Sequence, residues 1–321
     1  MSAQLNKYKL AQLNILRINY NRALAILTNL ITKINQSRAT RANKNQQIRI
    51  IISTINTLRQ KYNNDVQYIK LLKIRTRNPD KFALLIGINY KETPYELFGC
   101  IRDTENIKQL LTSHFSYPAQ NIVIVTDDAP QKPTKQTILS QLTTLLTNSI
   151  AGDTLFLLYS GHGSYTTDLN HDELDNQDEL IVSLDLQFIS DDELFNVIKT
   201  NLKPGVTLFA LFDSCFSGTI LDLHYNYLPS SNNDNPTTSG QIILISSCLD
   251  NQTSSEANTN NGNMGALCAA FLNTIQSDNS NQLNYNTLIE SMRNFLLDNR
   301  FKQITQLSSG QPLDILSLCS F

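Results

Sequence analysis

The chain lacks several features that would define its class. It has no tryptophan and no apolar stretch close to the ~20 residues that a membrane-spanning helix needs. Polar residues such as Arg17 and Arg22 interrupt the apolar positions near the N-terminus, unlike a secretory signal peptide. The five cysteines are an odd number, which favours free thiols over a complete disulfide framework. We therefore expect a protein without membrane spans, located in the cytoplasm, where thiols stay reduced.

Acidic residues are nearly absent from the first 77 positions. This segment has 15 lysines and arginines but a single acid, Asp65, and so carries a net charge of +14. The rest of the chain holds the other 11 basic and 27 acidic residues, a net charge of −16. Such a division of charge indicates two parts with different surroundings. We predict two domains, a basic helical segment over residues 1–77 and an acidic domain over residues 78–321.

Apolar residues in the basic segment recur three and four positions apart, a spacing typical of amphipathic helices and coiled-coil seams. One run extends from Leu10 to Ile34 and a second from Ile48 to Leu72, with a polar stretch between them. The helices can fold back as a hairpin, pair with another chain or pack on the main domain. Their charge can attract nucleic acid or an acidic surface, or the acidic part of the same chain.

After Pro79, short apolar runs alternate with amphipathic helical patterns. This alternation predicts an α/β fold with a mostly parallel central sheet and helices on both faces. Two polar stretches, 225–240 and 250–263, are predicted as loops. The predicted strands are residues 82–89, 121–126, 154–159, 206–212 and 241–247, and the predicted helices are 103–113, 134–148, 191–200, 264–275 and 285–298.

Two of these strands are followed by reactive side chains. Ser-Gly-His-Gly at 160–163 follows one, and Asp213-Ser214-Cys215 ends the other. Parallel strands end at one edge of a sheet, so His162 and Cys215 should lie near each other. An imidazole can activate a thiol for nucleophilic attack, and the N–H groups of Gly163 and Cys215 can form an oxyanion hole. The pattern predicts a cysteine–histidine hydrolase.

The same residues resemble the metacaspases, a family of caspase-like cysteine peptidases. The resemblance covers about residues 80–320 and includes Ser-Gly-His-Gly at 160–163, Asp-Asp-Glu-Leu at 191–194 and Asp-Ser-Cys-Phe-Ser-Gly at 213–218. It implies a caspase-like fold and a peptidase domain over residues 78–321. Many members carry a pro-region before this domain, so the resemblance implies that the basic segment, residues 1–77, is a pro-region or an interaction segment. Two positions depart from the family pattern. Phe216 stands where a histidine is usual, and Arg102 where a small polar residue is usual.

The resemblance also implies a substrate pocket. Asp103, Ser160 and Asp213 match positions that line the primary specificity pocket of metacaspases. Two carboxylates and a hydroxyl make a cation-binding hole, in which a guanidinium gains charge-assisted hydrogen bonds. We therefore expect a Cys215–His162 endopeptidase that cleaves peptides or proteins after Arg or Lys.

Ten acidic residues lie between positions 168 and 193. A hard cation can gather such carboxylates, and Ca²⁺ takes six to eight oxygens. The alternative is a solvated acidic turn that leads into a helix N-terminus, where acids are favourable. The resemblance favours calcium, at Asp175, Asp191, Asp192 and Asp222. We expect a calcium-dependent enzyme with a monomeric catalytic domain.

Two other interpretations remain. One is a catalytically weak or inactive caspase-like scaffold whose basic N-terminal helices bind a partner or nucleic acid. The other is a hydrolase of the same fold with a different specificity. The presence of Cys215 and His162 favours the active enzyme, whereas Phe216 and Arg102 weigh slightly towards the scaffold.

Overall fold

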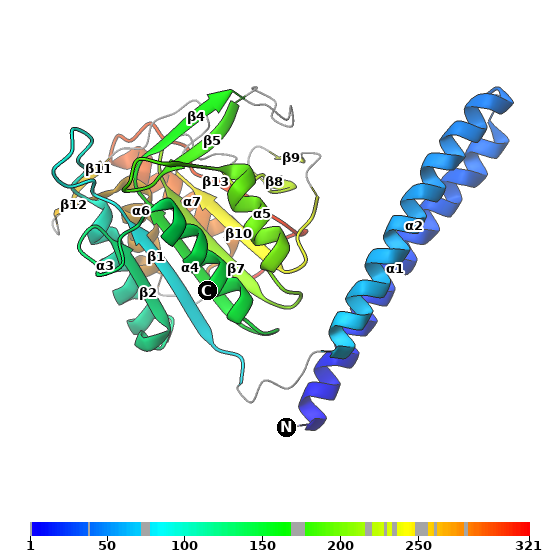
Figure 1. Ribbon diagram of the computed structural model, residues 1–321, viewed down its shortest axis with the longest axis horizontal. Coiled ribbons are helices and arrows are strands. Elements are labelled where there is room, and N and C mark those ends of the chain that lie inside the picture. The colour runs from blue at the N-terminus through cyan, green and yellow to red at the C-terminus, as the bar shows by residue number, and fades with distance from the viewer. Residues whose placement is uncertain are drawn as a thin grey trace. The chain divides into compact units, whose positions relative to one another are not determined.

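The structure is a computed structural model of the 321-residue chain. It forms two compact units, residues 1–78 and 79–321 (Figure 1). None of the helices in the described part of the chain is long and apolar enough to cross a membrane. The described residues are 2–37, 39–71, 78–167, 177–215, 220–227, 230–232, 236–247, 256–259, 262–278 and 282–321.

The first unit is a hairpin of two long helices, α1 (Ser2–Gln36) and α2 (Arg41–Leu71). Their half-buried residues follow the three-and-four spacing of the sequence, and the rings of Tyr20 and Tyr62 stack across the seam at 4.4 Å. The two predicted helices are thus confirmed, and they fold back on each other. No described side chain of the hairpin between positions 13 and 66 is fully buried, because two helices can cover only one face of each other.

The second unit is built around an eight-stranded sheet with the order β2-β1-β3-β7-β10-β13-β8-β9. Five strands pair in parallel, and the last three pair antiparallel at one side. The predicted mostly parallel sheet is confirmed. The bounds are β1 (Lys81–Gly87), β2 (Ile122–Thr126), β3 (Thr154–Ser160), β7 (Thr207–Asp213), β10 (Gln241–Ser246), β13 (Gln306–Ser309), β8 (Tyr225–Tyr227) and β9 (Ser230–Asn232).

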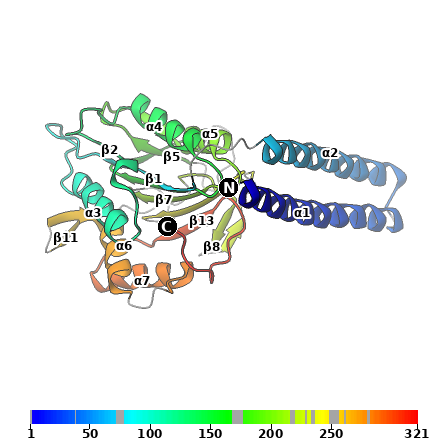
Figure 2. The ribbon, with the colours of Figure 1, turned by 90° about the horizontal axis from the view of Figure 1, so that it is seen from below.

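Helices cover both faces of this sheet, as Figure 2 shows. Alternate residues of a strand point to opposite faces, so Ala83 and Leu85 join one apolar cluster while Leu84 and Ile86 join the other. The first cluster includes residues of α3 (Cys100–Ser113), α6 (Ala266–Ser277) and α7 (Tyr285–Asp298). The second includes residues of α4 (Lys135–Asn148) and α5 (Asp191–Asn201).

Several short elements were not predicted from the sequence. They are β4 (Gly163–Thr167), β5 (Gln177–Val182) and β6 (Phe188–Ser190), which form a three-stranded sheet, the pair β11 (Glu256–Thr259) and β12 (Gly262–Gly265), the strand β13 of the main sheet, and the 3₁₀ turn Ala119–Asn121. The stretches predicted as loops also contain β8, β9, β11 and β12. These strands are short, and their sequences do not show the regular apolar alternation or the long apolar run that marks a strand.

The core around Phe209 generates a stability prediction. This side chain is 0% exposed, and its ring lies 5.4, 5.9 and 4.8 Å from those of Phe156, Phe271 and Phe321. Phe209→Ala should lower the free energy of unfolding by about 3–5 kcal/mol, because the cavity cannot close fully. Leu297→Ala, at a position 71% exposed, is the control and should change it by less than about 0.5 kcal/mol. Urea unfolding followed by circular dichroism measures both; equal losses would contradict the assignment of the core.

Candidate active site

The pairing of β3 with β7 brings the two reactive segments together. The strands are parallel neighbours, with Ser160 opposite Asp213, so the residues that follow them leave the same edge of the sheet. The Gly161 N–H donates to the carbonyl oxygen of Asp213 at 3.3 Å. A Cβ atom on Gly163 would lie 1.9 Å from the Cys215 carbonyl oxygen, so only glycine fits. The segment that carries His162 therefore packs backbone to backbone against the half-buried Cys215.

The imidazole of His162 is oriented by neighbours that the sequence did not reveal. Its Nε2 lies 2.8 Å from the carbonyl oxygen of Tyr95. Because a carbonyl only accepts hydrogen bonds, Nε2 carries the proton in this contact and Nδ1 is left as the basic nitrogen. The ring of Tyr90 packs on the imidazole with the ring centroids 4.7 Å apart. This tautomer leaves Nδ1 able to take a proton from a thiol.

The three predicted pocket residues lie together and are almost fully buried. Asp103 is 0% exposed, Ser160 1% and Asp213 4%. The Ser160 hydroxyl donates to Asp103 Oδ2 at 2.7 Å. One carboxylate oxygen of each aspartate lies within 4.8 Å of the other and of Cys268 Sγ. The two carboxylates thus form a compact, strongly negative site at the edge of the sheet where β3 and β7 end.

The N-terminus of α6 faces this pair of carboxylates. The Gly265 N–H lies 3.1 Å from both carboxylate oxygens of Asp103, and the Cys268 N–H donates to Asp213 Oδ2 at 2.9 Å. Helix N-termini carry partial positive charge and stabilise anions. A Cβ atom on Gly265 would lie 2.1 Å from Asp213 Oδ2, so glycine is required for this approach. Neither residue was predicted as part of the site; Gly265 belonged to the stretch Gly265-Ala266-Leu267 that resembles metacaspases, but it was placed inside the predicted helix 264–275, which begins at Ala266 in the structure.

Cys268 is the third member of this cluster and is 0% exposed. Burial, followed by the negative charges of Asp103 and Asp213, raises the pKa of its thiol well above the usual value. The thiol therefore stays protonated and neutral at physiological pH, unlike a catalytic nucleophile.

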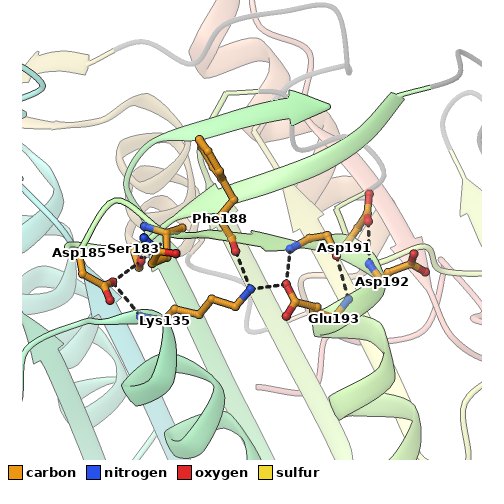
Figure 3. Close-up of polar contacts among 9 residues, drawn as sticks. Lys135, Ser183, Asp185, Phe188, Asp191, Asp192 and Glu193 are labelled. Atoms are coloured by element: carbon orange, nitrogen blue, oxygen red, sulfur yellow. Dashed lines mark hydrogen bonds and ion pairs between the residues drawn. The ribbon is translucent and has the colours of Figure 1, made fainter. Parts of the chain in front are cut away.

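The acidic segment, residues 168–193, ends in the first turn of α5 with Asp191, Asp192 and Glu193, as Figure 3 shows. Asp191 is 2% exposed, and its carboxylate accepts the N–H groups of Glu179 and Asp192, each at 2.6 Å. Ser190 and Glu193 form a reciprocal cap at the start of the helix, and Lys135 Nζ pairs with Glu193 at 2.7 Å. Some of the acidic residues between 168 and 193 thus stabilise the N-terminus of α5, as the interpretation of an acidic turn leading into a helix expected.

The predicted calcium ligands are only partly described. Asp175 lies outside the described residues, while Asp191 and Asp222 are 2% and 3% exposed. Among the described residues, Asp191, Asp192 and Asp222 do not form a set of three with ligand atoms within 4.8 Å of one another. The donor chemistry still fits Ca²⁺, because these acids and the buried Glu179 offer only hard oxygen atoms. The four-residue set stays a prediction.

Comparison with known proteins gives one family. A family model described as the metacaspase peptidase C14 domain matches residues 81–224. Metacaspase-1 of Schizosaccharomyces pombe is 34% identical, over 81% of this chain and 74% of that protein. Metacaspase-1 of Kluyveromyces lactis is 33% identical, over 72% of this chain and 66% of that protein. A crystal structure of a Geobacter sulfurreducens protein superimposes with a TM-score of 0.57 at 19% identity, covering 75% of this chain and 100% of that one; this likeness concerns the fold alone.

The site generates a prediction about thiol reactivity. Iodoacetamide at mildly alkaline pH should alkylate Cys215 in the folded protein much faster than Cys268 or Cys319. Burial raises the pKa of Cys319 to about 12 and that of Cys268 well above normal, so both have little thiolate at that pH. Timed alkylation followed by peptide mass spectrometry measures the three rates. In denaturant the rates should become similar, and faster labelling of Cys268 than of Cys215 in the folded protein would contradict the prediction.

Proposed function

The chain belongs to the metacaspase family of cysteine peptidases, and on that premise we propose that it is a calcium-dependent endopeptidase that cleaves after Arg or Lys. The observation that carries this proposal is the placement of two buried carboxylates, Asp103 and Asp213, at the sheet edge from which His162 and Cys215 emerge. A nucleophile beside a buried anionic pocket favours a substrate with a cation next to the scissile bond.

In the proposed reaction, His162 and Cys215 act as a dyad. The Tyr95 carbonyl holds Nε2 of His162, so Nδ1 takes the thiol proton as Cys215 Sγ attacks the scissile carbonyl carbon. The N–H groups of Gly163 and Cys215 stabilise the oxyanion. The imidazolium then gives its proton to the leaving amine, which leaves a thioester on Cys215. In the second half, the imidazole deprotonates a water that hydrolyses the thioester.

The pocket acids select the residue before the cleaved bond. The N–H groups of α6 and the Ser160 hydroxyl donate hydrogen bonds to two buried carboxylates. An Arg or Lys side chain adds a full charge, whereas an Asp side chain would add a third negative group. The same argument predicts that neutralising either acid weakens the binding of basic substrates.

Calcium is the proposed cofactor, held by Asp175, Asp191, Asp192 and Asp222. When bound, Ca²⁺ would supply hard positive charge that neutralises clustered carboxylates. The proposed ligands also connect this region to the segment that carries His162. Asp191, at the N-terminus of α5, accepts the backbone N–H of Glu179 on β5. Strand β5 pairs with β4, which begins at Gly163.

The N-terminal hairpin supports a second proposed role, binding to nucleic acid or to an acidic surface. The segment 1–77 that contains it carries 15 of the 26 lysines and arginines of the chain, and apolar side chains such as Ile15, Ile26 and Ile50 are 53–62% exposed. If the peptidase activity were absent, the protein would be a scaffold that acts through this hairpin. We propose that the protein is cytoplasmic, that its substrates are proteins with exposed basic residues and that its catalytic domain is monomeric.

Turnover of fluorogenic peptides tests the activity and the specificity together. Peptides ending in Arg or Lys should be cleaved, and the matching Asp peptide should not. Cys215→Ala and His162→Ala should each lower kcat by orders of magnitude with the fold retained. Asp213→Asn should reduce kcat/KM for the Arg peptide by the equivalent of about 2–5 kcal/mol, the cost of truncating one member of a buried ion pair. Near-normal turnover by Cys215→Ala, or a preference for Asp, would refute the mechanism or the pocket.

Calcium dependence is tested by titration. Activity should rise with Ca²⁺ over the high micromolar to millimolar range, on the order of other weak protein sites. The double substitution Asp191→Asn with Asp192→Asn should abolish this rise but leave the alkylation of Cys215 detectable. Asp298→Asn, at an exposed position on α7, is the matched control and should behave like the wild type. Full activity in excess chelator would show that the acidic segment is only a solvated turn.

A further inference from the structure

Two buried tyrosine hydroxyls hold the backbone of His162 on both sides. The His162 N–H donates to Tyr90 Oη at 3.0 Å, and the Tyr159 hydroxyl donates to the His162 carbonyl oxygen at 2.8 Å. Tyr90 in turn donates to the Val182 carbonyl oxygen at 2.6 Å, and Tyr159 Oη accepts the Val182 N–H at 3.2 Å. Both tyrosines are 0% exposed. Tyr159 Oη also lies 2.9 Å from the Val182 carbonyl oxygen and 3.2 Å from Tyr90 Oη, so the two hydroxyls and the backbones of His162 and Val182 form one hydrogen-bonded cluster.

Tyr90 also contributes to the placement of the imidazole itself. Its ring lies against the His162 ring, with centroids 4.7 Å apart and planes inclined by 39°. Its carbonyl oxygen accepts the Thr93 hydroxyl at 2.7 Å, and that hydroxyl accepts the Tyr95 N–H at 3.1 Å. Tyr95 then presents its carbonyl to Nε2 of His162. The segment that starts at Tyr90 therefore contacts His162 at its backbone, at its ring face and at Nε2.

The backbone of Tyr90 is strained. Its φ is +51°, in the left-handed region that a bulky aromatic residue rarely adopts. The Asp127 carboxylate, just after β2, brackets this residue: Oδ1 accepts the Asn89 N–H at 2.9 Å and Oδ2 accepts the Lys91 N–H at 3.0 Å. Strain of this kind persists only where the surroundings over-determine the conformation, and it clusters at functional sites.

We propose that Tyr90 is a positioning residue for His162, with Tyr159 as its partner and Asp127 as the group that fixes Tyr90. This inference rests on the proposed role of His162 as the base of the dyad. Tyr90 keeps the imidazole in the orientation in which Nε2 meets the Tyr95 carbonyl and Nδ1 remains basic. Burial raises the pKa of both tyrosines well above normal, so their hydroxyls stay protonated donors throughout the pH range of an activity assay.

A matched control lies elsewhere in the same domain. Tyr117 is 2% exposed, and its hydroxyl has no hydrogen-bond partner among the described residues. Tyr117→Phe therefore removes one buried hydroxyl without touching His162. Tyr90→Phe removes one buried hydroxyl and keeps the ring that packs on the imidazole. Any difference between the two variants reports on the hydrogen bonds of the Tyr90 hydroxyl, to His162, Val182 and Tyr159, rather than on the loss of a buried hydroxyl as such.

The test uses the full chain and two readouts. The first is the alkylation rate of Cys215 by iodoacetamide across pH, with the site identified by mass spectrometry; this readout needs no substrate. The second is kcat and KM on an Arg peptide. Tyr90→Phe should lower kcat about five- to tenfold, the size of effect expected when one hydrogen bond is lost. KM should change little, and the pH profile of alkylation should shift towards that of an unassisted thiol.

Two further variants keep the test decisive if Tyr90→Phe folds poorly. Asp127→Asn acts on the strained backbone without touching His162 and should shift the alkylation profile in the same direction. Tyr159→Phe should also lower kcat, and the effects of Tyr90→Phe and Tyr159→Phe should not be additive, because both act on one group. Tyr117→Phe should match the wild type in both readouts.

The possible failures are distinguishable. A wild-type alkylation profile that is already that of an unassisted thiol would remove the dyad and, with it, the role of Tyr90. A second failure is possible when the wild-type alkylation profile is that of a thiol assisted by a base. If Tyr90→Phe and Asp127→Asn then behave like Tyr117→Phe, the positioning role of Tyr90 is overturned and the proposed dyad stands. A rise in KM with unchanged kcat would also overturn the positioning role, because such a change reports on substrate binding rather than on proton transfer.

Discussion

The parallel pairing of β3 with β7 is the constraint on which the rest of this structure depends. It sets Ser160 opposite Asp213, so the segments after both strands must leave the sheet at one edge and at one level. The close approach of Gly163 to the Cys215 carbonyl follows from this register. A one-residue slip would turn every side chain of a strand to the opposite face, where each would have to repack against the other apolar cluster. The apolar cores on the two faces therefore fix the geometry of the site.

The second feature is the burial of negative charge. Isolated buried carboxylates are costly, and they are tolerated only where hydrogen bonds and opposite charge compensate them. Here α6 begins directly beside Asp103 and Asp213, and Gly265 permits the approach because it has no Cβ atom. A helix N-terminus carries about half a positive charge, which favours an anion placed beside it.

The charges of the two units have opposite sign, and their structures differ in kind. Residues 79–321 bury two large apolar clusters on the faces of the sheet, whereas the described hairpin residues from 13 to 66 include none that is fully buried. A two-helix hairpin obtains most of its stability from a single seam. The apolar side chains left exposed on the hairpin are the observation that supports the proposed binding role.

The sequence by itself determined the elements whose signals are local. The apolar runs identified the parallel strands, the three-and-four spacing identified the helices, and the residues after two strands identified His162 and Cys215 as candidates. Only the tertiary structure could reveal Tyr90, Tyr95, Gly265 and Cys268, because each reaches the site through contacts between residues distant along the chain. The short strands β4 and β5 were missed for the same reason. The positions of these strands depend on their pairing with each other and on the contacts of Val182 with Tyr90 and Tyr159. Neither the pairing nor these contacts produce a periodic pattern in the sequence.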